Sequence, residues 1–184
     1  MDFGLWVLIG PQRVEINQRS KTKSPRPKTK DQTLGSKMRP TPTGWPRISS
    51  AVYYEDAAAA IDWLCRAFDF KVRVKIEGEG GSIEHSELSY GEGLVMVGQA
   101  GLANKPSFRK SPRSVDGANT QNMMVYVDDV EAHCTQARNA GAKIVSEPKT
   151  TNYGEEWWTD RGYECEDLEG HHWWFYQRLR DATK

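Results

Sequence analysis

Residues 125–148 read VYVDDVEAHCTQARNAGAKIVSEP and predict a strand, a helix and a second strand in direct succession. The first strand is the run Gln121–Val127, and the second begins at Lys143. Between them, Asp129 supplies the short carboxylate that caps a helix N-terminus, and Gly141 stands where a left-handed residue ends a helix. The positions that form the apolar face of this helix are Val130, Cys134 and Ala137.

The same order of elements is found on both sides of this stretch. Towards the C-terminus, residues 157–165 and 172–177 are two further strand candidates. Towards the N-terminus, residues 48–54 predict a strand, Asp56 opens an amphipathic helix that reaches Phe68, and three more strands follow with glycine-rich turns between them. The ranges of those three strands are 70–77, 82–90 and 93–99. Each half therefore reads β-α-β-β-β.

The two halves also match residue by residue. A shift of 73 positions places Val52 on Val125 and Asp56 on Asp129, and a shift of 77 places Glu92-Gly93 on Glu169-Gly170. An internal repeat of this kind indicates a duplicated supersecondary unit. We therefore predict an α+β domain over residues 46–180, with one βαβββ module at about 46–104, a linker at about 105–119 and a second module at about 120–180.

The first 45 residues differ in composition from this domain. The 184-residue chain carries 25 Lys+Arg and 25 Asp+Glu. Residues 1–37 hold eight of the basic residues and three of the acidic ones, whereas residues 38–184 hold 17 and 22. A basic segment with few apolar residues cannot offset the entropy of ordering, so we expect residues 1–45 to form a disordered leader. Met38 is an alternative translation start, and contact with nucleic acid or anionic lipid is an alternative role for the leader.

Composition also narrows the class of protein. The acidic domain is not expected to bind nucleic acid, and no apolar run approaches the ~20 residues of a membrane span. The three cysteines show no C-x-x-C spacing, which favours reduced thiols and a cytoplasmic location over disulfides or a zinc site.

Four segments of the domain carry a family resemblance. They are AAIDWLCRAFDF (59–70), EHSELSYGEGLVMVG (84–98), VYVDDVEAHCTQARNAGAKIVSEP (125–148) and DRGYECEDLEGHHWWF (160–175). In this order they resemble the vicinal oxygen chelate superfamily, and most closely its PhnB-like and glyoxalase-like members. The superfamily includes glyoxalase I and the bleomycin-resistance proteins. The resemblance implies that the two modules form a cupped mixed sheet, as in the glyoxalase/bleomycin resistance/dihydroxybiphenyl dioxygenase fold. One departure is Asp69, where the subgroup usually has glycine.

Metal-dependent members of this superfamily hold an ion at four positions on the concave face of the sheet. Carried over to this sequence, those positions are occupied by Ser49, Val97, Asn122 and Trp174. None is a histidine or a carboxylate, which are the donors that such ions favour. The resemblance therefore implies a member without a metal at the usual position, and no cofactor is predicted. A relocated divalent metal site built from His85, Glu87 and His172 is the alternative.

Strand alternation places a further set of side chains in the predicted cup. His85 and Glu87 are the candidates for catalytic acid–base work, although a simple pair on an exposed strand is an equal alternative. Arg161 matches a recurring arginine of the subgroup and would bind an anion, or else form an ion pair with Glu164 or Glu166. The predicted ligand-binding residues are Tyr53, Asn122, Met124, Tyr126, Arg161, His172, Trp174 and Tyr176.

Three functions are compatible with these residues. The first is a small-molecule binding protein of the bleomycin-resistance kind, whose aromatic cup holds an organic ligand without breaking a bond. The second is a metal-dependent enzyme of glyoxalase type with a relocated site. The third is a metal-free isomerase or lyase with Glu87 or His85 as base. We favour the first and leave open whether a reaction is catalysed. The resemblance also implies a homodimer.

Overall fold

The computed structural model describes residues 7–9, 12–14, 39–102 and 108–183. The chain divides into two compact units, Met1–Arg39 and Pro40–Lys184. In the first unit, β1 (Val7–Ile9) and β2 (Gln12–Val14) form an antiparallel pair. The remainder of the expected leader up to residue 38 lies outside the described residues. Among the described helices, none has the length and apolar character needed to cross a membrane.

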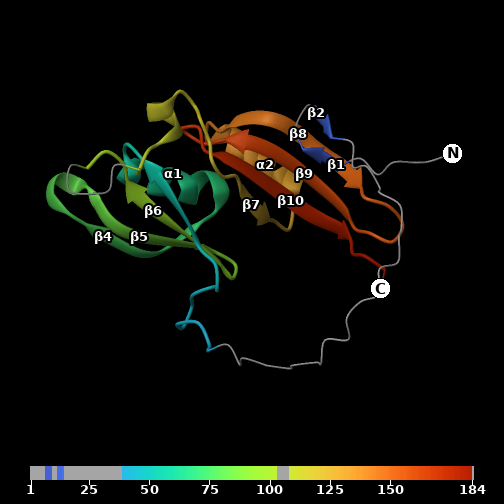
Figure 1. The fold of residues 1–184 in the computed structure, drawn as a ribbon, viewed down its shortest axis with the longest axis horizontal. Helices are drawn as coiled ribbons and strands as arrows, with labels where there is room; N and C mark the ends of the chain where they lie inside the picture. Colours follow the sequence, from blue (N-terminus) through green and yellow to red (C-terminus); the bar gives the residue numbers. More distant parts are fainter. Residues whose placement is uncertain (1–6, 10–11, 15–38, 103–107, 184) are drawn as a thin grey trace, which may run out of the picture. The chain divides into compact units, whose positions relative to one another are not determined.

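The first module forms one four-stranded sheet with one helix (Figure 1). Its elements are β3 (Ser50–Tyr54), α1 (Ala57–Phe68), β4 (Lys71–Glu77), β5 (Ile83–Tyr90) and β6 (Gly93–Gln99). The strand order is β3-β6-β5-β4, in which β3 runs parallel to β6 and the other pairs are antiparallel. The helix crosses over between β3 and β4.

The second module repeats this topology. Its elements are β7 (Met123–Tyr126), α2 (Val130–Asn139), β8 (Lys143–Asn152), β9 (Thr159–Glu166) and β10 (His172–Arg180). The strand order β7-β10-β9-β8 corresponds to that of the first sheet, again with one parallel pair, β7 with β10. The predicted α+β architecture of two tandem βαβββ modules is therefore confirmed.

Both helices begin at the predicted caps. The side chain of Asp56 accepts a hydrogen bond from the backbone N–H of Ala59 at 3.0 Å, and Asp129 accepts from two backbone N–H groups of the first turn of α2. Gly141 adopts a φ of 93° immediately after α2. Asp69 ends α1 with a φ of 61°, a left-handed conformation that costs least for glycine.

The sequence predicts a strand from Lys143 to Ser146, but β8 continues to Asn152 and includes Pro148. Proline has no N–H for a ladder and is therefore confined to edge strands and irregular positions. β8 is the edge strand of its sheet, and its register against β9 shifts between Ser146 and Lys149. This position explains why proline is accepted within the strand.

The core lies between the helices and one face of each sheet. Alternate residues of the strands point to this face, among them Val52, Leu88, Trp173 and Phe175, each at most 1% exposed. The ring of Phe68 from α1 packs against both Trp173 and Phe175 of β10 at centroid distances of 5.3 and 4.7 Å. The core is therefore shared by the two modules.

A second connection between the modules is polar. The turn between β9 and β10 carries Asp167, which accepts hydrogen bonds from the hydroxyl of Tyr54 and the indole N–H of Trp173. Glu169 of the same turn accepts from the backbone N–H groups of Glu55 and Asp56, just before α1. The Asp167 and Glu169 residues are 6% and 3% exposed. This turn therefore fixes the position of the second module against the start of the first helix.

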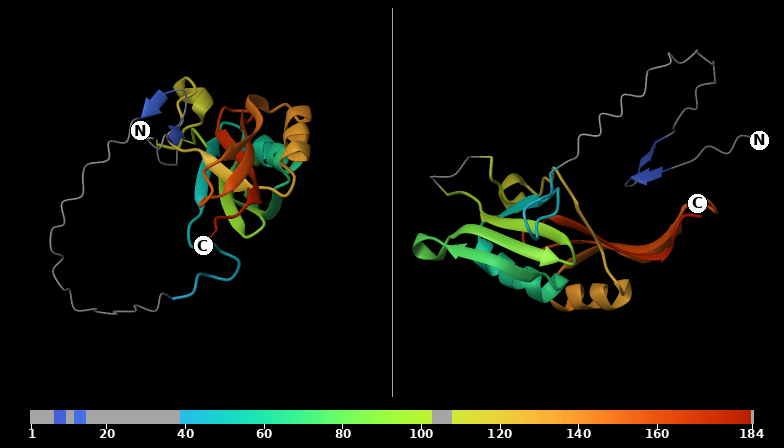
Figure 2. Two further views of the ribbon diagram at one scale, coloured as in Figure 1. Left: turned by 90° about the vertical axis from the view of Figure 1, so that its right-hand side faces the viewer. Right: turned by 90° about the horizontal axis from the view of Figure 1, so that it is seen from below.

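Figure 2 shows both α-helices on the same side of the two sheets. Neither α-helix of the described residues covers the opposite side of a sheet, and we call these two surfaces the open faces. On the first module the open face carries Tyr53, Met96 and Gly98, because their neighbours Val52 and Val97 point into the core. On the second it carries Met124, Trp174 and Tyr176.

Candidate functional site

A cleft of about 850 Å³ lies between the two modules. One wall is β7, from Met123 to Tyr126, together with Trp173 of β10. The opposite wall comes from the first module: Phe70 at the start of β4, the turn between β5 and β6, and Leu94. Ligand pockets commonly have volumes of roughly 300–1,000 Å³, so this cleft has room for an organic molecule.

The lining of the cleft combines apolar side chains with three serines, Ser49, Ser50 and Ser89, and with charged groups at its margins. Asp69 and Lys71 form an exposed ion pair of 2.5 Å with each other. Glu92 and Asp128, also on the lining, bring the formal charge of the four groups to −2. Tyr90 also lines the cleft, and burial, supported by the charge of Asp128, raises its pKa. A ligand in the cleft would therefore meet apolar walls and a weakly negative margin.

The open face of the second module gathers several of the predicted ligand-binding residues. Met124 lies opposite Trp174 across the parallel β7–β10 pair, and Tyr126 lies opposite Tyr176 with ring centroids 6.2 Å apart. Met124 and Tyr126 are 58% and 43% exposed. Both residues also line the cleft, so the cleft opens directly onto this aromatic surface. Asn122 lies exposed just before β7.

An arginine that the sequence analysis did not single out organises one end of this surface. Arg178 of β10 has its guanidinium 5.2 Å from the ring centroid of Tyr126 and 5.4 Å from that of Trp158. It also forms an ion pair of 2.5 Å with the buried carboxylate of Asp160 and donates a hydrogen bond to the Tyr126 hydroxyl. The hydrogen bond with Asp160 raises the pKa of Arg178. These long-range contacts leave no local pattern in the sequence.

On the first module, Tyr53 covers Gly98, where an added Cβ would lie 3.0 Å from the tyrosine ring. The guanidinium of Arg109, from the linker, lies 5.2 Å from the centroid of the same ring. Tyr53 is therefore held on the open face by a glycine below it and a cation above it. It lies on a different sheet from Met124 and Tyr126.

His85 and Glu87 do form a pair on β5. His85 Nε2 lies 3.0 Å from Glu87 Oε1, and the Glu87 side chain is 9% exposed whereas that of His85 is 40% exposed. Arg73 of β4 lies on the other side of Glu87, with its Nε 3.4 Å from Oε2. The pair is thus one exposed imidazole and one buried carboxylate, rather than two exposed residues on a strand.

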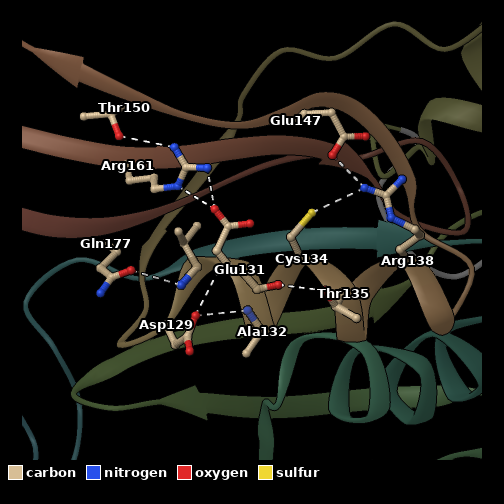
Figure 3. A network of polar contacts seen from close by, with 11 residues as sticks. Asp129, Glu131, Ala132, Cys134, Thr135, Arg138, Glu147, Thr150, Arg161 and Gln177 are labelled. Atoms are coloured by element: carbon tan, nitrogen blue, oxygen red, sulfur yellow. Dashed lines mark hydrogen bonds and ion pairs between the residues drawn. The ribbon is translucent and has the colours of Figure 1, made fainter.

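Arg161 lies on the helix-covered side of its sheet (Figure 3), whereas Trp174 lies on the other side, the open face. Its guanidinium forms a 2.5 Å ion pair with Glu131 of α2 and donates to the hydroxyl of Thr150 at 3.2 Å. Neither Glu164 nor Glu166 is its partner there. The structure therefore separates Arg161 from the open face and from the predicted ligand-binding residues on it.

The four positions carried over from metal-dependent relatives need one correction in register. Val97 is 1% exposed and points into the core, and it pairs with Val52 as Phe175 pairs with Val125. The open-face equivalent of Trp174 is therefore Met96. Methionine is a soft ligand that does not replace the imidazole and carboxylate donors of such sites. Ser49 precedes β3, and its Oγ is buried without a hydrogen-bond partner among the described residues.

The alternative metal site is also not assembled. His172 interacts with carboxylates of its own sheet, through Nδ1 at 2.9 Å from Glu164 and Nε2 at 3.6 Å from Glu166. His85 and Glu87 belong to the other sheet. In the described ranges, no three or more His, Cys, Asp or Glu side chains are arranged to hold a metal ion.

Comparison with known proteins assigns the chain to one family. The family model described as Glyoxalase/Bleomycin resistance protein/Dioxygenase superfamily matches residues 47–175. The uncharacterised protein Rv0887c of Mycobacterium tuberculosis is 30% identical over 138 residues, which are 75% of this chain and 78% of that protein. The uncharacterised protein Mb0911c of Mycobacterium bovis is also 30% identical, over 87% of its length.

Solved structures agree with this assignment. TioX from Micromonospora sp. ML1 is 32% identical with a TM-score of 0.56, and the match covers 72% of this chain and 98% of TioX. TnmS3 from Streptomyces sp. CB03234 is described as an antibiotic-binding protein. It is 16% identical with a TM-score of 0.51, over 71% of this chain and 93% of TnmS3. At that identity, the likeness to TnmS3 shows a shared fold.

Proposed function

Because the chain belongs to the glyoxalase/bleomycin resistance protein/dioxygenase superfamily, we propose that it is a binding protein for a small organic molecule. The observation that carries this proposal is the cleft of about 850 Å³ between the modules, with its continuation onto Met124 and Tyr126. The apolar part of the ligand would lie between β7 and the wall formed by Phe70 and Leu94. An aromatic ring would stack on Tyr126.

The residues at the family's metal positions support binding without a metal. Met96, Asn122 and Trp174 do not provide the anionic or imidazole donors that hold a divalent ion. The bleomycin-resistance kind of function, in which a ligand is sequestered without chemistry, needs none of these donors. TnmS3 shares this fold and is described as an antibiotic-binding protein, so antibiotics are the first class of compound to test.

A thermal-shift screen of the purified protein against antibiotics and other planar organic compounds tests this function. A ligand that binds only the folded state raises the unfolding temperature. Binding of each hit is then measured for Met124→Arg, which places a long cation at the cleft, and for Ile76→Arg as the matched control. Ile76 is similarly exposed, at 52%, but lies on β4 outside the lining. Binding should be lost only in Met124→Arg.

A second function is supported by the His85–Glu87 pair. The imidazole is exposed and lies 3.0 Å from a buried carboxylate, an arrangement in which the carboxylate orients the ring. We propose metal-free acid–base catalysis at His85 as this second function. Glu87→Gln would then lower turnover of a bound compound without abolishing its binding, and a hit that is recovered chemically unchanged would contradict it.

We also propose that the protein is a cytoplasmic homodimer. Two observations support these assignments. Apolar side chains including Val145, Trp157 and Leu179 are exposed on the second module, where a second copy would cover them, and the three cysteines are free thiols. Light scattering at concentrations from micromolar upwards tests the dimer: a monomer mass throughout that range would contradict it.

A further inference from the structure

The segment that enters the first module, residues 40–46, lies against Arg73 of β4. It contains a tight turn in which the N–H of Trp45 donates to the carbonyl of Pro42 at 2.9 Å. The next two carbonyls in the turn face Arg73: Nη2 donates to the oxygen of Thr43 at 3.1 Å, and Nη1 donates to that of Gly44. The guanidinium carbon also lies 5.9 Å from the centroid of the Trp45 ring.

Gly44 is required at this contact for two reasons. Its φ is 73°, which L side chains rarely adopt, and a Cβ added there would lie 3.1 to 3.2 Å from three atoms of the Arg73 guanidinium. The turn therefore comes close to the arginine only because no side chain intervenes. Arg73 thus holds the turn by two hydrogen bonds and a cation–π contact.

The guanidinium of Arg73 that contacts the turn also faces the carboxylate of Glu87. The Glu87 side chain is 9% exposed, and its Oε2 lies 3.4 Å from Arg73 Nε but accepts no hydrogen bond from the described residues. A buried carboxylate oxygen without a hydrogen bond is unfavourable, because its lost hydration is not replaced. The Nη groups that could satisfy Oε2 are directed at the turn instead. The turn and Glu87 therefore compete for the donors of one guanidinium.

This competition has a structural consequence. When the turn is in place, Arg73 is committed to two main-chain carbonyls and Glu87 is left with a free acceptor. When the turn moves away, the Nη group on the same edge of the guanidinium as Nε becomes available to Glu87 Oε2, which offsets part of the loss of the turn contacts. Two alternative sets of hydrogen bonds of similar strength lower the free-energy difference between the two arrangements.

We propose that residues 40–46 form a lid over Glu87, with Arg73 as its latch, and that opening of this lid controls access to the Glu87 carboxylate, whereas the His85 imidazole is 40% exposed with the turn in place. The proposal does not depend on a ligand in the cleft between the modules, because the lid lies on the open face of the first module.

Carboxyl footprinting of the full chain tests the lid directly. Carbodiimide and glycine ethyl ester modify accessible carboxylates, and mass spectrometry gives the rate at each residue. Glu92, which is exposed in the turn between β5 and β6, serves as the internal reference. In the unaltered protein Glu87 should react far more slowly than Glu92. Gly44→Ala, whose Cβ strains the turn against Arg73, should raise the Glu87 rate roughly tenfold.

The matched control is Gly117→Ala. Gly117 also has a positive φ, 80°, but no atom lies within 4 Å of its Cβ position, so the substitution adds the same backbone strain without touching Arg73. Trp45→Ala is a second lid variant, and should also accelerate modification of Glu87. Two results would overturn the proposal: Glu87 reacting as fast as Glu92 in the unaltered protein, or equal Glu87 rates in Gly44→Ala and Gly117→Ala.

Discussion

The hydroxyl of Tyr54 donates a 2.5 Å hydrogen bond to Asp167, and this bond joins the first strand of one module to the last turn of the other. The tyrosine is fully buried, and its burial, together with the charge of Asp167, raises its pKa, so the donor stays protonated. Asp167 in turn accepts from Trp173, whose ring lies in the shared core. The two modules are therefore coupled by one carboxylate as well as by apolar packing.

Removal of this donor should destabilise the whole domain in a single transition. In Tyr54→Phe the ring still fills the core, but the hydrogen bond from the hydroxyl to the charged carboxylate of Asp167 is lost, at a cost of about 1.5–3 kcal/mol. Urea unfolding monitored by tryptophan fluorescence and by circular dichroism measures the change. Tyr153→Phe, on an exposed tyrosine, is the control. Two separate transitions in Tyr54→Phe would contradict the coupling of the modules.

His133 should make stability depend on pH in the acidic range. It is 8% exposed, and its Nδ1 lies 2.8 Å from the hydroxyl of Tyr163. Burial lowers the pKa of His133, so the unfolded chain binds this proton more readily than the folded one. Its contribution is therefore present above the ordinary pKa of about 6.5 and is lost as pH falls through the lowered value.

Replacement of this histidine by glutamine removes the titration. The free energy of unfolding of His133→Gln, measured in urea at several pH values between 8 and 5, should fall less steeply with acidification than that of the unaltered protein. The two curves should converge as pH decreases. A difference in unfolding free energy between the two proteins that stays constant across this range would show that folding does not lower the pKa of His133, and would contradict the prediction.

Replacement of Asp69 by glycine should stabilise the protein. Asp69 ends α1 with a φ of 61°, and glycine occupies left-handed positions without the steric cost of a side chain. Asp69→Gly also removes an ion pair with Lys71, but both groups are more than half exposed, so that pair contributes little. We expect a gain of up to about 1 kcal/mol, measured as a higher unfolding temperature. Asp69→Ala, which keeps the strain, should show no gain.

Gly162 should be intolerant of any side chain. It lies opposite Tyr176 on the open face of the second module, and an added Cβ would lie 2.3 and 2.5 Å from two atoms of that ring. Gly162→Ala should therefore displace Tyr176 and lower both stability and ligand affinity. In the double variant Gly162→Ala/Tyr176→Ala the stability loss should be smaller than the sum of the single losses. Full additivity would contradict the contact.

Local patterns in the sequence were sufficient to predict the fold. The capping carboxylates of Asp56 and Asp129 depend on neighbouring residues, so the helices begin where expected. Alternation along a strand is likewise local, and on β10 it separates the core residues Trp173 and Phe175 from Trp174 and Tyr176. The extension of β8 through Pro148 could not be predicted in this way, because acceptance of proline depends on β8 being an edge strand, which is a property of the assembled sheet.

The candidate site could be predicted only in part from local sequence patterns. The sequence aligns the repeat on the Glu-Gly pairs of two turns, which places Val97 on Trp174. The strand pairing instead places Val97 on Phe175, and a shift of one residue reverses the face of a strand. Val97 was therefore placed on the open face where Met96 lies. Three further features join segments that are distant in sequence, so local patterns do not show them. They are the ion pair of Arg161 with Glu131, the contact of Arg73 with the lid, and the cleft itself.

The central claim is that a small organic molecule binds between β7 and the first module. It is tested most directly by isothermal titration calorimetry of one thermal-shift hit against the unaltered protein, Met124→Arg and Ile76→Arg. We predict equal dissociation constants for the unaltered protein and Ile76→Arg, and at least a roughly hundredfold weaker one for Met124→Arg, a loss of about 2.7 kcal/mol. Unchanged affinity in Met124→Arg would contradict binding in this cleft.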